Sequence, residues 1–220
     1  MSDFNIGFVI FPNLTQLDFT GPLQVLHRMP GAATHIVAKS LDPVPSDCGL
    51  GLLPTVTLRD CPQLDLICVP GGGGVAQAMV DPEIVDFVRG QSERARYVTS
   101  VCTGAFVLGM AGLLSGKRAT THWAYTDLLP RVGARHEKAR VVWDGNVVTA
   151  GGVTSGIDFA LDIVARIAGD DVARSIQLSI EYDPEPPFTS GHPDRAPAAI
   201  REQMIERFVA RRKPYQAALP

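Results

Sequence analysis

The chain has 220 residues, of which 45% are hydrophobic and 20% charged, with a formal net charge of −3 at pH 7. This length and composition are typical of one sizeable globular domain. The small negative charge argues against nucleic acid or an anionic membrane surface as a partner, and no apolar run approaches the roughly 20 residues that span a bilayer. Because the first residues lack the pattern of a secretory signal, we expect a cytoplasmic protein.

Strand and helix patterns alternate along the first half of the chain. Apolar or β-branched runs closed by turn signals predict buried strands at 6–10, 33–38, 64–70 and 97–101. Helical spacing predicts helices at 21–29, 82–94 and 105–114. The first helix has Pro22 near its start, and Asp81 is the expected N-cap of the second. Residues 43–58 are rich in turn residues, which favours a hairpin or an excursion at the sheet edge.

The second half adds a hairpin and a C-terminal arm. A short strand is expected at 119–121, then strands at 140–143 and 147–150 around Asp144-Gly145-Asn146, and helices at 156–167 and 171–181. This alternation predicts an α/β, flavodoxin-like three-layer sandwich with a mostly parallel central sheet. Residues 1–182 are expected to form that domain. The proline-rich residues 183–220, with a charged helix at 196–212, are expected to form an arm packed on the domain or on a dimer partner.

Cys102 stands at the junction between a predicted strand and a predicted helix. Helix-terminal N–H groups and the positive end of the helix dipole favour the thiolate there, and the thiolate is the nucleophile. A buried structural thiol is the alternative. The other three cysteines do not stand at a helix N-terminus, and without a Cys-x-x-Cys pair we expect no disulfide framework.

An acidic residue and a glycine run follow two other strands of the predicted sheet. Asp18 comes after the first strand, and the glycines 71–74 come after the strand at 64–70. Because ligand chemistry gathers at the carboxyl ends of parallel strands, an acid, a bare-backbone loop and the thiol of Cys102 are expected to converge. Asp18 has apolar neighbours, which favour burial and a raised pKa. Capping of the next helix and a simple tight turn are the alternatives for the two features.

The histidines give no visible Cys-His pair. His122 ends a short strand and is expected to stabilise structure through hydrogen bonds, while His192 lies in the tail. No histidine has metal-ligand spacing, so we expect neither a metal nor another cofactor.

Three motifs carry a resemblance to a known family: Pro70-Gly71-Gly72, Val101-Cys102-Thr103-Gly104 and Ala119-Thr120-Thr121-His122-Trp123. Over residues 6–181 the chain resembles the ThiJ/PfpI superfamily, which has the class I glutamine-amidotransferase-like fold. The resemblance implies a cysteine on a nucleophile elbow opposite an acid from the first strand–helix loop. The protease-like and glyoxalase-like branches carry glutamate in that loop and often histidine after the cysteine. Here the positions hold Asp18 and Thr103, which argues against proteolysis.

Two branches share the aspartate and the Cys-Thr-Gly motif: the sensor domains of AraC-type regulators and the isocyanide hydratases. The chain stops before a helix-turn-helix domain, and residues 177–194 resemble the C-terminal arm of the hydratases. The resemblance therefore implies a homodimeric hydro-lyase that converts a small-molecule isocyanide to an N-formamide. Cys102 would form a thioimidate, and Asp18 would act as general acid and base. A cysteine enzyme acting on α-oxoaldehydes and a non-enzymatic redox sensor are the alternatives.

Further residues are expected to support this pair. The Thr103 hydroxyl and the N–H of Gly72 are expected to orient the acid or stabilise charge near the adduct. Gly151, Gly152 and Thr154 follow the last strand and are expected to line the pocket, although a tight strand-to-helix turn explains them equally well.

Overall fold

A seven-stranded sheet lies at the centre of the molecule, whose residues 4–220 are described by a computed structural model. The strand order is β10-β11-β7-β6-β1-β2-β5. Neighbouring strands are parallel except β10 and β11, which form the predicted antiparallel hairpin. The strands are β1 (Phe4–Val9), β2 (Ala32–Ala38), β5 (Val56–Thr57), β6 (Leu66–Val69), β7 (Tyr97–Val101), β10 (Val141–Asp144) and β11 (Val147–Ala150).

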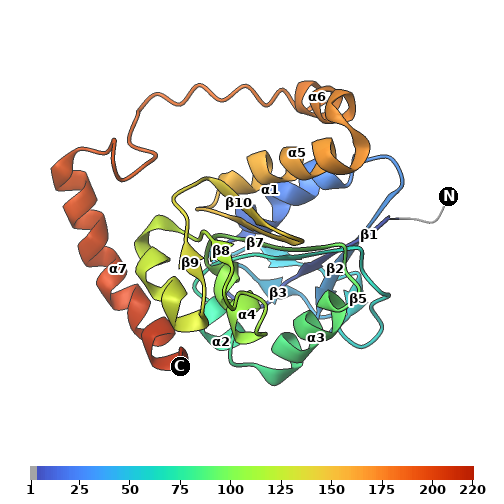
Figure 1. The fold of residues 1–220 in the computed structure, drawn as a ribbon, viewed down its shortest axis with the longest axis horizontal. Helices are drawn as coiled ribbons and strands as arrows, with labels where there is room; N and C mark the ends of the chain where they lie inside the picture. Colours follow the sequence, from blue (N-terminus) through green and yellow to red (C-terminus); the bar gives the residue numbers. More distant parts are fainter. Residues whose placement is uncertain (1–3) are drawn as a thin grey trace.

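Helices cover both faces of this sheet (Figure 1). One face carries α1 (Gln16–Leu26) and α5 (Ser155–Ala168), with α6 (Asp170–Ser179) packed on α5. The other face carries α2 (Val75–Ala78), α3 (Pro82–Ser92) and α4 (Ala105–Met110). The α/β sandwich predicted from the alternation of patterns is thus confirmed.

Several short elements lie at the edges of the sandwich. The turn-rich region 43–58 forms an antiparallel pair, β3 (Val44–Pro45) with β4 (Gly51–Leu52), before β5 joins the sheet edge. A second pair, β8 (Arg118–Ala119) with β9 (Arg135–His136), is parallel. Two 3₁₀ segments, η1 (Cys102–Gly104) and η2 (Trp123–Val132), were not expected from the sequence patterns.

Two helix boundaries differ from the prediction in ways that matter for the site. Helix α1 begins at Gln16 rather than at residue 21, so Asp18 lies in its first turn and Pro22 lies inside it. Pro22 has no N–H, and the helix tolerates it at the loss of one backbone hydrogen bond. Helix α4 ends at Met110 rather than at residue 114, because the chain turns at Gly112, where φ is +83°.

The last helix, α7 (Ala198–Ala218), extends six residues beyond the predicted helix and runs beside η2 (Figure 1). Its far end is buried: Leu219 is 5% exposed, and the Arg131 guanidinium donates hydrogen bonds to three carbonyl oxygens at the chain end. No helix among residues 4–220 is long and apolar enough to cross a membrane.

Candidate active site

Cys102 sits on a sharp turn between β7 and α4. Its φ is +56°, a left-handed conformation that costs a residue with a Cβ on the order of 1 kcal/mol. Its neighbours stabilise this conformation: the Cys102 N–H donates to the Gly151 carbonyl at 2.8 Å, and the Cys102 carbonyl accepts from Thr121 Oγ1 at 2.8 Å. A strained residue between a buried strand and a helix is the geometry of a nucleophile elbow.

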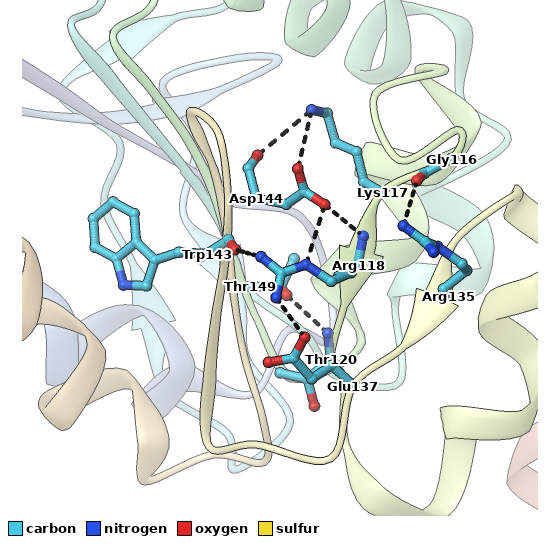
Figure 2. A network of polar contacts seen from close by, with 9 residues as sticks. All are labelled: Gly116, Lys117, Arg118, Thr120, Arg135, Glu137, Trp143, Asp144 and Thr149. Carbon is cyan, nitrogen blue, oxygen red and sulfur yellow. Dashed lines mark hydrogen bonds and ion pairs between the residues drawn. The ribbon is translucent and has the colours of Figure 1, made fainter.

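A polar network fixes the segment that carries Thr121 (Figure 2). The Thr120 N–H donates to Thr149 Oγ1 at 2.8 Å, which joins this segment to β11. The Arg118 guanidinium donates to the Trp143 carbonyl at 2.8 Å and pairs with Glu137 at 2.9 Å. The hairpin therefore supports the hydrogen bond that holds the Cys102 carbonyl.

Asp18 reaches the same place from the first turn of α1. Its side chain is fully buried, and Oδ2 accepts a hydrogen bond from the Gly71 N–H at 2.9 Å. It does not cap the helix, whose N-cap is Thr15. Oδ1 has no hydrogen-bond partner in the described chain, and the carboxyl of Asp18 and the side chain of Cys102 both lie against Gly71. The structure thus brings together the acid and the thiol that the sequence predicted to converge.

Burial sets the protonation of both groups. Desolvation raises the pKa of Asp18 to about 7, against the opposing effect of the Gly71 N–H, and the charge of Asp47 adds a smaller upward effect. Burial, and then the negative charge of Asp18, raise the pKa of Cys102 well above its usual value. The N–H groups of Thr103 and Val153 oppose this shift.

The expectation that the helix dipole favours the Cys102 thiolate is therefore wrong. The sulfur belongs to a residue that is only 6% exposed, and α4 has only six residues, so desolvation outweighs the dipole. The redox-sensor alternative relied on a low-pKa thiol and loses that support. A thiolate can still form where Asp18 keeps the proton, because the two groups then share one charge.

Gly71 is the point where the two groups and the glycine turn meet. A Cβ placed on Gly71 would lie 2.6 Å from the Thr103 nitrogen and 2.8 Å from both Asp18 Oδ2 and Cys102 Cβ. These contacts are closer than real Cβ atoms make, so only glycine fits here. The structure thus places the backbone of the glycine loop against both Asp18 and Cys102.

Gly71→Ala is expected to abolish activity and to destabilise the fold by at least about 2 kcal/mol, because the Thr103 backbone on one side and Asp18 and Cys102 on the other cannot yield. Chemical denaturation with an activity assay measures both effects. Gly90→Ala is the control: nothing lies within 4 Å of the added Cβ in α3. It is expected to be neutral or slightly stabilising. A Gly71→Ala protein as stable and active as the wild type would contradict this account of the turn.

The Thr103 hydroxyl and the Gly72 N–H, which were predicted to support the pair, are hydrogen-bonded to each other. The Gly72 N–H donates to Thr103 Oγ1 at 3.1 Å, so neither group is aimed at the sulfur in this structure. The part of Thr103 that faces the sulfur is its backbone N–H. A charge-stabilising role for the Gly72 N–H would require this bond to break, and the two residues are better described as positioning the turn.

Loop 151–154 contacts Cys102 and also lines a large cavity. Gly151 binds the Cys102 N–H through its carbonyl, and the Val153 N–H faces the sulfur. Gly151, Gly152 and Thr154 also line a cavity of about 640 Å³, together with His122 and Trp123. Neither Cys102 nor Asp18 is part of that lining. The loop therefore joins the surroundings of Cys102 to the cavity, and its place in a substrate pocket stays a prediction.

His122 packs beside this loop as a neutral ring. Burial lowers its pKa to about 4, and Nδ1 accepts a hydrogen bond from the Ala124 N–H at 3.2 Å. The ring lies 5.0 Å from the ring of Phe208, and a Cβ on Gly152 would come within 2.9 Å of it. These contacts agree with the structural role expected for His122. His192 lines the same cavity, and its Nδ1 accepts from the Asp194 N–H at 3.2 Å.

Tyr215 is a residue of the site that sequence reasoning missed. It is 2% exposed, and its hydroxyl lies 2.6 Å from the Gly72 carbonyl and 3.1 Å from Thr103 Oγ1. The predicted charged helix ended at Arg212, before this residue. A signal was present: Phe208, Tyr215 and Leu219 recur at spacings of seven and four, which is typical of one face of a helix.

Known proteins share this architecture. A sequence model of the DJ-1/PfpI family matches residues 5–166, which contain the elbow, Asp18 and the glycine turn. The chain belongs to the DJ-1/PfpI family. The expected resemblance to the ThiJ/PfpI superfamily is thereby confirmed, and Asp18, Gly71 and Cys102 follow β1, β6 and β7 at the carboxyl ends of these strands.

Within the DJ-1/PfpI family, similarity extends over nearly the whole chain in two cases. The isonitrile hydratase of Pseudomonas putida is 57% identical over 202 residues, which are 92% of this chain and 89% of that protein. A crystal structure of a ThiJ/PfpI family protein from Pseudomonas syringae has a TM-score of 0.96 and 44% identity, covering 99% of this chain and 91% of that one. The HTH-type transcriptional regulator GbdR of Pseudomonas aeruginosa is 28% identical over 189 residues, which are 81% of this chain and 51% of the regulator.

Proposed function

We propose that this protein is an isocyanide (isonitrile) hydratase, a hydro-lyase that adds water to an isocyanide to give an N-formamide. The observation that carries the proposal is the 57% identity to the Pseudomonas putida isonitrile hydratase over 92% of the chain. The pairing of a buried acid with a cysteine on an elbow supports it, because the reaction needs a nucleophile and a proton donor at one place.

The first step uses both members of the pair. The Cys102 thiolate forms a bond from Sγ to the terminal carbon of R–N≡C, and the proton of Asp18 moves to that same carbon. The product is a thioimidate, R–N=CH–S, on Cys102, and Asp18 is left ionised. Oδ1 of Asp18 is suited to hold the proton, since Oδ2 already accepts from the Gly71 N–H and Oδ1 has no partner.

Water completes the reaction. Asp18 takes one proton from a water molecule whose oxygen bonds to the thioimidate carbon. The second water proton ends on nitrogen as the C–S bond breaks, which releases R–NH–CHO and restores the Cys102 thiolate beside protonated Asp18. Atoms balance as R–NC plus water giving the formamide, and no external oxidant or reductant is needed.

Burial of the sulfur suits this class of substrate. Cys102 is 6% exposed and Asp18 is fully buried, so a bulky carbonyl compound has little room to approach. An isocyanide carries its reacting carbon at the end of a linear group with no other substituent. Such a carbon can reach a recessed nucleophile while the organic substituent stays outside.

The pH profile follows from the two raised pKa values. The reactive form has one proton on the pair, with Asp18 protonated and Cys102 ionised. Because burial raises the pKa of Asp18 to about 7 and that of Cys102 well above its usual value, the pair loses its first proton near pH 7 and its second far higher. We expect kcat/KM to rise through about pH 7 and to stay level beyond pH 8. A profile that falls between pH 6 and pH 8 would contradict this assignment.

The test of the proposal is product formation. Purified protein is mixed with a simple aryl isocyanide, and the N-aryl formamide is measured by chromatography beside a parallel assay on methylglyoxal. Formamide without turnover of methylglyoxal is the expected result. Turnover of methylglyoxal alone would favour the α-oxoaldehyde enzyme, and turnover of neither would rule out both enzymatic readings.

Two broader expectations accompany this function. We expect a homodimer, supported by exposed apolar side chains on the C-terminal part: Leu178 is 81%, Phe188 77% and Val209 56% exposed. Sedimentation velocity tests it, and a monomer at micromolar concentration would contradict it. We also expect a cytoplasmic location, which is supported by the four cysteines, all of them free thiols in the described chain.

A further inference from the structure

One polar side chain of the C-terminal helix lies beside the residues that follow Gly71 and Cys102. Tyr215, near the end of α7, is separated by 143 residues from Gly72, yet its hydroxyl lies 2.6 Å from the Gly72 carbonyl. The same hydroxyl is 3.1 Å from Thr103 Oγ1. In the described chain, no other buried hydrogen bond joins α7 to a residue next to Cys102.

The directions of these hydrogen bonds follow from the groups involved. A carbonyl oxygen only accepts, so the single phenol proton goes to the Gly72 carbonyl, which is the shorter contact. Thr103 Oγ1 lies 3.1 Å from the phenol oxygen as the second acceptor of the phenol, and it also accepts from the Gly72 N–H at 3.1 Å. The three groups form a closed hydrogen-bond ring. The carbonyl of Gly72 also accepts from the Val75 N–H at 3.2 Å.

This ring adjoins both members of the catalytic pair. Gly72 follows Gly71, whose N–H donates to Asp18 Oδ2 at 2.9 Å. Thr103 follows Cys102, and its backbone N–H faces the sulfur. The ring therefore ties the backbone that supports the acid to the backbone that supports the nucleophile.

The phenol is itself held in place. Its ring packs 5.7 Å from that of Phe106 and 4.8 Å from that of Tyr125. The Arg131 guanidinium donates to the carbonyls of Gln216 at 2.9 Å, Leu219 at 2.7 Å and Pro220 at 3.0 Å. These contacts hold the Tyr215 hydroxyl in one position, so its hydrogen bonds can fix the conformation of the glycine turn.

We propose that Tyr215 is a positioning residue for the Cys102–Asp18 pair, an inference that rests on the proposed hydratase function. Its hydroxyl touches neither reacting side chain. It acts through Gly72 and Thr103, which set the donor to Asp18 Oδ2 and the N–H that faces the Cys102 sulfur. The C-terminal arm is then part of the active site and not only a packing element.

Tyr215→Phe tests this role because it keeps the packed ring and removes only the hydroxyl. We expect kcat for formamide formation to fall at least about tenfold while KM changes by less than about twofold, since misplacement of the pair affects the chemical steps and not binding. A thermal melt of each variant accompanies the assay, and kinetics are measured well below the melting temperature.

A second readout needs no isocyanide. The rate at which iodoacetamide alkylates Cys102 is measured against pH. The Gly71 N–H lowers the pKa of Asp18. A loosened turn weakens that hydrogen bond, so the midpoint of the Tyr215→Phe profile is expected to move up by about half a pH unit or more.

Tyr182→Phe is the matched control. It also removes one tyrosine hydroxyl, which donates to Asp158 in α5 at 2.7 Å, a bond that involves neither Gly72 nor Thr103. This variant is expected to keep the wild-type kcat and alkylation midpoint. An unshifted midpoint in Tyr215→Phe, or an equal loss in both variants, would overturn the positioning role even if the protein hydrates isocyanides. A protein that hydrates none would overturn the proposed function, and the alkylation midpoint would still decide the role of Tyr215.

Discussion

Cys102→Ala is expected to lower the rate of formamide formation from an aryl isocyanide by at least about 1,000-fold. The reason is that the proposed first step forms a bond to the Cys102 sulfur, and this side chain lies with Asp18 against Gly71. Steady-state kinetics at pH 8, with product measured directly, give the ratio. The protein should still fold, because alanine keeps the backbone hydrogen bonds that hold the elbow.

Cys48→Ala is the control for this substitution, because Cys48 is an exposed thiol outside the site. It is expected to keep wild-type activity. Turnover by Cys102→Ala above about a tenth of the wild-type rate would show that water attacks the isocyanide without a covalent intermediate.

Asp18→Asn is expected to abolish turnover and at the same time to stabilise the protein. The amide cannot deliver or accept the proton that moves in both steps of the reaction. The size of the stabilisation depends on pH. The folded-state pKa of Asp18 is about 7 against a usual value of 3.8, so its contribution to stability is full below pH 3.8 and is lost as the pH rises through about 7.

The gain from Asp18→Asn should therefore appear at pH 8 and be absent near pH 4. Its size is on the order of 2 kcal/mol, since the avoided ionisation cost is reduced by an amide nitrogen left without a partner. Urea denaturation at the two pH values measures it. A variant that is less stable than the wild type at pH 8 would contradict the view that Asp18 is held against its own ionisation.

Much of the fold and the convergence of Cys102 with Asp18 could be predicted from the sequence, because the signals are local. The β-branched run 97–101 followed by Cys102 and small residues predicts a strand and a sharp turn, and the structure has both. Asp18 was placed correctly at the strand ends because parallel strands deliver their following loops to one edge. Its burial and raised pKa followed from its apolar neighbours.

Other features depend on contacts that no local pattern carries. The pKa of Cys102 is decided by how deeply the turn is buried, and the helix dipole alone predicted the wrong direction. The bond between the Gly72 N–H and the Thr103 hydroxyl joins two loops 31 residues apart. Tyr215 joins them from the chain end, across a long segment without regular structure, so only the fold reveals it.

The most direct measurement is a rapid-quench experiment on the wild-type protein mixed with an aryl isocyanide, read by intact-protein mass spectrometry and peptide mapping. A transient species heavier than the protein by one isocyanide is expected, located on the peptide that contains Cys102. That species should decay at the rate at which the formamide appears. Formamide formed in the first turnover with no mass added to the protein, or with the mass on another residue, would contradict the covalent mechanism.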